Sequence, residues 1–113
     1  MYQQTALLLN QIEAELRQLQ LWSPVPPDSA ALASTLPFCY DTLMFEQWLQ
    51  FVFLPRMRAL VQGRLPLPTK SGISAMAEQA LAPITADKVW LIQRIAELDQ
   101  LLGAQEGQAD ADV

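Results

Sequence analysis

The sequence predicts an all-α protein, a small helical bundle of three long helices and two short ones. Three segments repeat apolar residues every three to four positions, which is the period of one helix face. Proline-rich stretches separate these segments, and a proline cannot continue the hydrogen-bond ladder of a helix. Strand signals are weak, since the one β-rich run, Phe51 to Leu54, lies inside a helical period. Each apolar face must be buried against the others, because isolated helices of this length are marginal in water.

The first long helix is expected over residues 3–21. Its apolar face consists of four residues spaced by three or four: Leu9, Ile12, Leu16 and Leu19. The stretch from Ser23 to Pro27 contains three prolines and ends this helix. Asp28 then has the character of an N-cap, which predicts a short helix over residues 29–34.

A second long helix is expected after Asp41, where apolar side chains again recur with helical spacing. Four of them are predicted to face the core: Phe45, Trp48, Leu49 and Val52. At residues 51–54 the apolar side chains point around the whole cylinder, which is typical of a fully buried turn. Pro55 follows at once, so the helix either kinks there or stops and restarts with Pro55 in its first turn. It then resumes as far as Gly63, a predicted C-terminal glycine.

The remaining chain predicts a connector and two more helices. Residues 64–72 form an extended connector whose two prolines favour polyproline II geometry. A short helix follows, with Ser74 as its cap and Pro83 as its stop. Thr85 is predicted to cap the last long helix, and Gly103 to end it. The apolar stripe of that helix is Leu91, Ile95, Leu98 and Leu102.

Composition and charge indicate one folded domain over residues 1–103 and a flexible acidic tail over residues 104–113. Hydrophobic residues make up 51% of the chain and charged residues 17%, which is typical of a globular domain. The net charge of −5 argues against non-specific adhesion to nucleic acid or anionic membranes. No apolar run approaches the roughly 20 residues of a membrane span. A lone cysteine, Cys39, and no recognisable secretory signal predict a cytoplasmic protein.

Histidine is absent from the sequence. A Ser–His or Cys–His nucleophile pair and a histidine general base are therefore excluded. A zinc site would have to use Cys39 and carboxylates alone. We therefore expect no catalytic residue, no metal and no cofactor, and we expect that the protein is not an enzyme.

The block PFCYDTLMFEQWLQFVFLPRM, residues 37–57, is followed by LPLP at residues 65–68 and MAEQAL at residues 76–81. Together these stretches resemble the YqcC-like family of small bacterial proteins, and the resemblance covers about residues 1–103. It implies a small all-helical bundle of unassigned biochemical function. Members of that family tend to be named beside a tRNA pseudouridine synthase, which is an association and supplies no catalytic residue.

The first functional hypothesis is an interaction or accessory protein whose partner is another protein. Its candidate contact residues are Phe51, Phe53 and Leu54 in the apolar turn, and Trp90, which falls off the stripe of its helix. Burial of the apolar turn in the core is the competing and favoured interpretation. A tRNA-modification enzyme is the partner that the resemblance implies, and self-association stays open.

The second hypothesis is a module that binds an anion or an RNA backbone. Four basic residues fall between residues 47 and 77, where no acidic residue occurs: Arg56, Arg58, Arg64 and Lys70. The arginine fork matches phosphate geometry. The competing interpretation is solvated arginines near the end of a helix.

Overall fold

A computed structural model of the chain describes residues 2–69, 72–85 and 87–111, with side chains described as far as Ala104. Over these residues the chain is helical and has no strand, which confirms the all-α prediction. Two of the long helices are α1 (Tyr2–Gln18) and α6 (Val89–Ala111). The third is continuous and consists of α3 (Phe45–Trp48), the π-helical turn η2 (Leu49–Phe53) and α4 (Leu54–Gln62). The shorter elements are α2 (Ser29–Leu32), the 3₁₀ turn η1 (Pro37–Cys39) and α5 (Ile73–Ala80).

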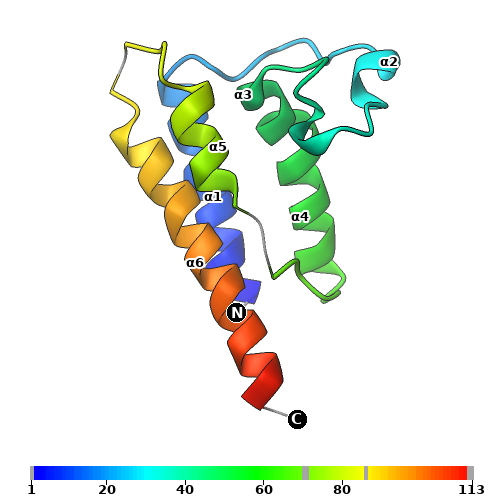
Figure 1. Cartoon of the computed structure of the whole chain (residues 1–113), viewed down its shortest axis with the longest axis vertical. Helices are drawn as coiled ribbons and strands as arrows, with labels where there is room; N and C mark the ends of the chain where they lie inside the picture. The colour runs from blue at the N-terminus through cyan, green and yellow to red at the C-terminus, as the bar shows by residue number, and fades with distance from the viewer. Residues whose placement is uncertain (1, 70–71, 86, 112–113) are drawn as a thin grey trace.

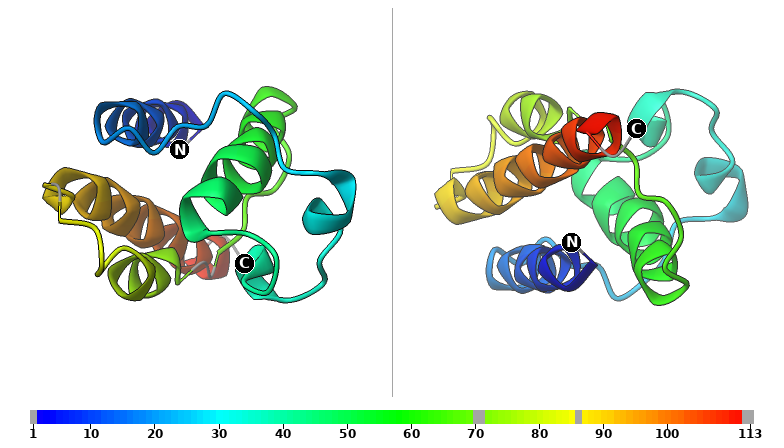
Figure 2. Two further views of the ribbon diagram at one scale, coloured as in Figure 1. Left: turned by 90° about the horizontal axis from the view of Figure 1, so that it is seen from above. Right: turned by 90° about the horizontal axis from the view of Figure 1, so that it is seen from below.

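Helix α6 holds the bundle together, because it packs against both α1 and α5. It runs antiparallel to α1, and α4 packs against α1 as well (Figure 1). Seen along the bundle, α6 lies between α1 and α5, and the continuous helix α3–η2–α4 closes one side (Figure 2). Helix α2 lies beyond the continuous helix, and the η1 turn packs against α3 at the start of that helix (Figure 2).

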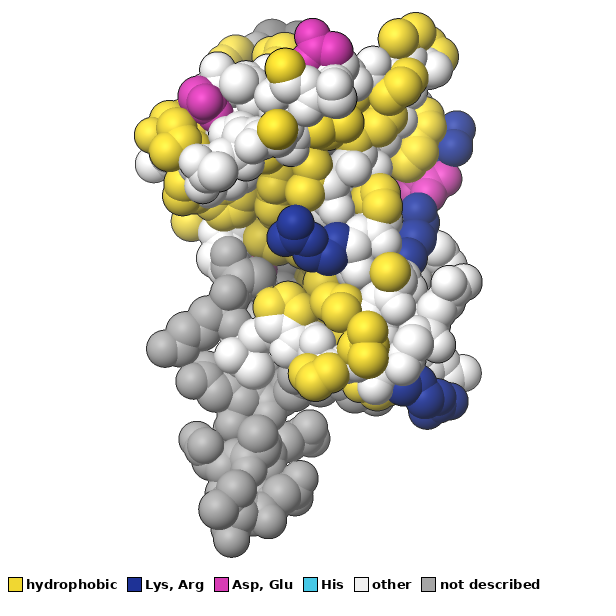
Figure 3. Space-filling view, turned by 90° about the vertical axis from the view of Figure 1, so that its right-hand side faces the viewer, with side chains coloured by type: hydrophobic (Ala, Val, Ile, Leu, Met, Phe, Trp, Pro, Cys, Tyr) yellow, Lys and Arg dark blue, Asp and Glu magenta, His cyan; other side chains and the backbone are white. Residues whose placement is uncertain are grey.

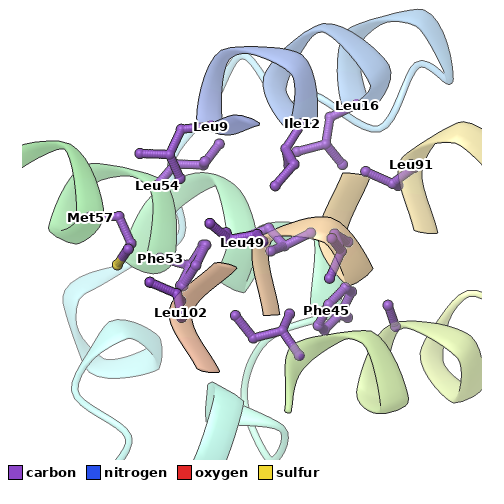
Figure 4. Close-up of a cluster of buried hydrophobic side chains, with 14 of the residues drawn as sticks. Leu9, Ile12, Leu16, Phe45, Leu49, Phe53, Leu54, Met57, Leu91 and Leu102 are labelled. Carbon is purple, nitrogen blue, oxygen red and sulfur yellow. The ribbon is translucent and has the colours of Figure 1, made fainter. Parts of the chain in front are cut away.

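The core is built from the apolar faces of the long helices, as the close-up in Figure 4 shows. Its fully buried members include Leu9, Ile12, Leu16, Leu49, Leu54, Met57, Leu91, Ile95, Leu98 and Leu102. Two residues predicted for the core differ from this set. Trp48 and Val52 are only half-buried, and Trp48 packs at the edge of the core.

The apolar turn before Pro55 is a π-turn. The backbone N–H of Leu54 donates to the carbonyl of Leu49, five residues earlier. Phe53 and Leu54 both keep helical dihedral angles, so the helix passes through Pro55, and the predicted alternative of a stop and restart is wrong. In a regular α-helix the ring of Pro55 would clash with the carbonyl of Phe51. The wider turn relieves that clash, and its extra residue brings both Phe53 and Leu54 onto the buried side.

The N-terminus of α5 is capped from another helix. Gly72 precedes α5 with a left-handed φ of 59°, a conformation that glycine adopts readily. The carboxylate of Asp99, on α6, then accepts hydrogen bonds from the backbone N–H groups of Ile73 (3.2 Å) and Ser74 (2.7 Å). Ser74 is therefore inside the helix, and its prediction as the cap is wrong because a distant carboxylate already occupies that role.

The caps predicted for α2 and α6 can also be compared with the structure. Asp28 caps α2 as predicted, since its carboxylate accepts from the N–H of Ala31 at 2.8 Å. Helix α6 begins after Asp87, whose carboxylate accepts from the first N–H of the helix at 3.2 Å, and not after Thr85. It also continues past Gly103 to Ala111, so the predicted end of the helix is wrong. The separation of residues 104–113 from the bundle as a flexible tail stays a prediction.

Candidate functional site

Four aromatic rings pack together at the edge of the core. The ring of Phe38 meets Trp48 edge-on, with 4.8 Å between centroids. Trp48 in turn stacks with Phe45 at 6.0 Å and with Phe53 at 5.2 Å. Edge-on and offset arrangements are the favoured geometries of aromatic pairs. Phe38 therefore fastens the η1 turn to the continuous helix.

Three of these rings line an open pocket of about 230 Å³. Its lining consists of Phe38, Trp48, Phe53, Arg56, Met57, Pro68 and Ile73. Arg56 is the one charged side chain in this lining, and it is exposed. Among the side chains that the structure describes, no carboxylate forms an ion pair with Arg56. The pocket thus combines an apolar, largely aromatic wall with an exposed guanidinium.

The backbone of the η1 turn is strained where it forms this wall. Phe38 has φ 58° and Cys39 has φ 49°, both in the left-handed region that bulky residues rarely adopt. Such a conformation costs on the order of 1–3 kcal/mol for each residue and persists only where the surroundings fix it. Here the packing of the Phe38 ring and the burial of Cys39 supply that restraint. Neither position is a glycine, so this left-handed turn could not be predicted from the residue types.

Three large apolar side chains are exposed to solvent on the short segment that carries Phe38, residues 36–44. We call them the η1 patch: Leu36 (41% exposed), Tyr40 (59%) and Met44 (64%). Between them, Cys39 and Leu43 are buried, and the ring of Phe38 packs against the core of the bundle. Figure 3 shows many hydrophobic side chains in the upper half of this face and further ones below, with acidic side chains near the top and basic side chains at mid-height. Exposed apolar patches of this kind mark contact sites more often than scattered apolar residues do.

The four contact residues predicted from the sequence do not lie together on the surface: two are buried, one is half-buried and one is exposed. Phe53 (6% exposed) and Leu54 (0%) belong to the core, so the hypothesis that they protrude is wrong for both. The π-turn buries them by adding a residue to the buried face. Phe51 is half-buried. Trp90 is 54% exposed on α6, where the guanidinium of Arg94 lies 5.3 Å from the centre of its ring.

Arg58 is neutralised by α1. Its guanidinium lies 2.7 Å from the carboxylate of Glu13 and 3.2 Å from the amide oxygen of Asn10. Arg17 binds the same carboxylate at 2.9 Å. Burial acts to raise the pKa of Glu13, but hydrogen bonds from Arg58 and Arg17, helped by their charges, outweigh it and hold the pKa below its ordinary value. Arg58 is therefore a structural link between α4 and α1.

The other predicted basic residues are not gathered at one place. Arg56 borders the aromatic pocket, whereas Arg58 faces α1. Arg64 is exposed beyond the end of α4 with φ 51°. Lys70 lies outside the described residues. The structure therefore does not assemble the predicted arginine cluster into a single anion site.

Sequence reasoning missed the residues that make this surface. Leu36, Tyr40 and Met44 recur at every fourth position, but residues 36–44 do not form an α-helix, so this spacing was no guide to their exposure. Phe38 had no signal, because its role depends on the ring of Trp48, which meets it edge-on from a different element.

Two general features bear on the site. Within residues 2–69, 72–85 and 87–111, no helix is long and apolar enough to cross a membrane. The same part of the chain holds no group of three or more side chains suited to bind a metal ion.

Comparison with known proteins gives relatives over almost the whole chain. A family model described as tRNA pseudouridine synthase C matches residues 4–101. An uncharacterised protein of Haemophilus influenzae is 43% identical over 81 residues, which is 72% of this chain and 76% of that protein. Uncharacterised protein YqcC of Escherichia coli is 35% identical over 95 residues, covering 84% of this chain and 87% of YqcC.

A solution NMR structure of Escherichia coli YqcC has the same fold, with a TM-score of 0.79 and 32% identity. The match covers 90% of this chain and 87% of that one. A protein of Pectobacterium carotovorum named tRNA pseudouridine synthase C is 53% identical over 57 residues. Those residues are 50% of this chain but 15% of that longer protein, so the similarity concerns one segment of it.

Proposed function

This chain belongs to the YqcC-like family, and on that premise we propose that it is an accessory protein that binds a tRNA pseudouridine synthase. In this proposal it acts in the cytoplasm, has no catalytic activity of its own and docks through the η1 patch. The observation that carries the proposal is the exposed row of Leu36, Tyr40 and Met44. A small bundle with a filled core has no structural need for three large apolar side chains in solvent on one short segment.

The nature of the partner is supported by the Pectobacterium protein. A segment similar to half of this chain occurs there within one polypeptide that is named a tRNA pseudouridine synthase. Segments joined covalently in one protein are held at high effective concentration, which favours contact between them. The same two units on separate chains would then need a docking surface, and the η1 patch supplies one.

A companion role fits the chemistry of the pocket better than catalysis does. Its lining offers one guanidinium and otherwise apolar side chains. Such groups bind and orient a ligand, but they include no carboxylate, imidazole or thiol that could act as a general acid or base. The η1 patch likewise offers contact area and one phenol.

The proposal is tested by isothermal titration calorimetry with purified tRNA pseudouridine synthase from the same cell. The variant Tyr40→Asp with Met44→Asp should weaken binding at least about tenfold, because hot-spot side chains at an interface cost more than 1 kcal/mol each. Val89→Asp is the matched control, since Val89 is 64% exposed but lies at the start of α6. It should leave the affinity unchanged.

Salt dependence distinguishes the docking mode. Apolar docking should change little when salt rises from about 0.05 to 0.2 M, whereas contacts to an RNA backbone weaken by orders of magnitude over that range. The proposal is overturned if the wild-type protein does not bind the synthase. It is also overturned if the double variant binds as tightly as Val89→Asp.

A further inference from the structure

We infer that the pocket beside the η1 patch receives one bulky apolar side chain of the partner, presented next to a carboxylate that pairs with Arg56. This inference rests on the proposed function only for the identity of the partner. The chemistry of the occupant follows from the size, the wall and the charge of the pocket.

Size limits the occupant to about one side chain. The pocket holds about 230 Å³ and opens to solvent. Sites for cofactors and drug-sized molecules occupy roughly 300–1,000 Å³. Interfaces commonly place a single aromatic or aliphatic anchor from one partner in a pocket of the other. The walls of Phe38, Trp48 and Phe53 suit such an anchor, since aromatic surfaces pack well against apolar side chains.

The positive charge of Arg56 determines which group of the partner can lie next to the apolar side chain in the pocket. A cage of aromatic rings alone would attract a cation. Arg56 lines the same pocket, and a positive ligand there would meet a guanidinium with no described ion-pair partner. A carboxylate instead gains a charge-assisted, bidentate hydrogen bond from the arginine fork. No acidic residue occurs between Gln47 and Ala77, so the sequence around Arg56 does not compete for it.

Contacts within the chain hold the wall of the pocket in place. Phe38 is held against Trp48 at 4.8 Å, and Trp48 stacks on Phe53 at 5.2 Å. The wall therefore need not be assembled on binding, which lowers the entropic cost of association. The left-handed backbone of Phe38 occurs at the residue whose ring makes this contact.

The inference is tested with two probes that differ in one charge, N-acetyl-phenylalanine and N-acetyl-phenylalanine amide. Each is titrated into the ¹⁵N-labelled full chain, and binding is read from NMR shifts of the Trp48 indole N–H and the backbone N–H groups of Phe38 and Arg56. The acid should shift these signals and bind at least about threefold more tightly than the amide. Arg56→Gln should abolish the preference for the acid, whereas Arg64→Gln, a second exposed arginine outside the pocket, should retain it.

Other results would overturn the inference. The pocket does not take an apolar anchor if neither probe moves these signals. The carboxylate is not recognised if acid and amide bind equally, or if Arg56→Gln leaves the preference intact.

A second experiment, which measures binding to the synthase, distinguishes failure of this inference from failure of the proposed function. Arg56→Glu should weaken binding to the synthase at least about tenfold, and Arg64→Glu should not. If the probes behave as expected but the wild-type protein does not bind the synthase, the pocket stands and the proposed function fails. If the synthase binds through the η1 patch but both probes fail, the proposed function stands and the inference fails.

Discussion

Gln50 shows how one residue can fix a connector. It is a buried polar side chain in the π-turn, and its amide makes two hydrogen bonds to the backbone of Ser23. The amide oxygen accepts from the backbone N–H of Ser23 and the amide nitrogen donates to its carbonyl, both at 2.8 Å. These two hydrogen bonds link the proline-rich connector after α1 to the continuous helix.

Gln50→Leu should therefore lower the free energy of unfolding by about 1–3 kcal/mol, because it leaves partly buried backbone groups without partners. Urea denaturation measures the loss. Gln62→Leu, at an exposed position of α4, is the control and should change stability by less than about 0.5 kcal/mol. Equal effects of the two substitutions would show that the contact with Ser23 contributes nothing.

The ion pairs of Glu13 should make the stability of the protein depend on pH. Its pKa in the folded protein lies below the ordinary value of 4.5 because Arg58 and Arg17 favour the carboxylate. The ion pairs are therefore fully stabilising above about pH 4.5, and their contribution is lost as the pH falls through the lowered pKa. Both arginines are well exposed, so the contribution is roughly 0.2–1 kcal/mol for each pair.

Thermal unfolding of the wild-type protein and Glu13→Gln checks this pH dependence. The wild-type protein should be the more stable near pH 7, and the difference should shrink as the pH falls below 4.5. Glu15→Gln is the control, since Glu15 forms no ion pair with any described side chain. A difference that stays constant at low pH would contradict the assigned ion pairs.

Among the elements, α5 depends most on another part of the chain. Its first two N–H groups are capped by Asp99 of α6, at 3.2 and 2.7 Å. Loss of a cap costs about 0.5–2 kcal/mol. Asp99→Ala should lower stability by this amount in urea denaturation, whereas Ser74→Ala should have an effect below about 0.5 kcal/mol. If Ser74→Ala were the more damaging, Ser74 and not Asp99 would be the cap.

The continuous helix makes a prediction about Pro55. Alanine is about 3 kcal/mol more favourable than proline in an ordinary helix interior. The π-turn already accommodates Pro55, and the core on both sides fixes that turn through Leu49 and Leu54. Pro55→Ala mainly makes the unfolded chain more flexible, which costs about 0.4–1 kcal/mol. Stability should therefore fall slightly; a gain of 2 kcal/mol or more would show that proline strains the helix.

The helices that the sequence predicted well are those whose pattern is local. Leu9, Ile12 and Leu16 mark the buried face of α1 by spacing alone, and Leu91, Ile95 and Leu98 do so for α6. The π-turn could not be predicted, because apolar residues on every side of a helix do not indicate which side faces the core. The Asp99 cap and the left-handed backbone of Phe38 were also beyond the sequence, because each depends on a residue distant along the chain.

For the whole molecule, local sequence patterns predicted the bundle, whereas the candidate site depends on residues that are distant along the chain. The YqcC-like fold followed from three apolar stripes and a resemblance that covered most of the chain. The candidate site did not, since its parts come from η1, the continuous helix and the connector before α5. Arg56 was predicted as one of a basic cluster, but its neighbours in space are Phe38 and Trp48.

The central claim is that the face carrying the η1 patch and the aromatic pocket meets the synthase. Hydrogen–deuterium exchange of the full chain, with and without the synthase, tests it most directly. Backbone amides of residues 36–57 should exchange more slowly in the complex, while those around Trp90 on α6 should be unchanged. Protection confined to α6, with residues 36–57 unaffected, would contradict the claim.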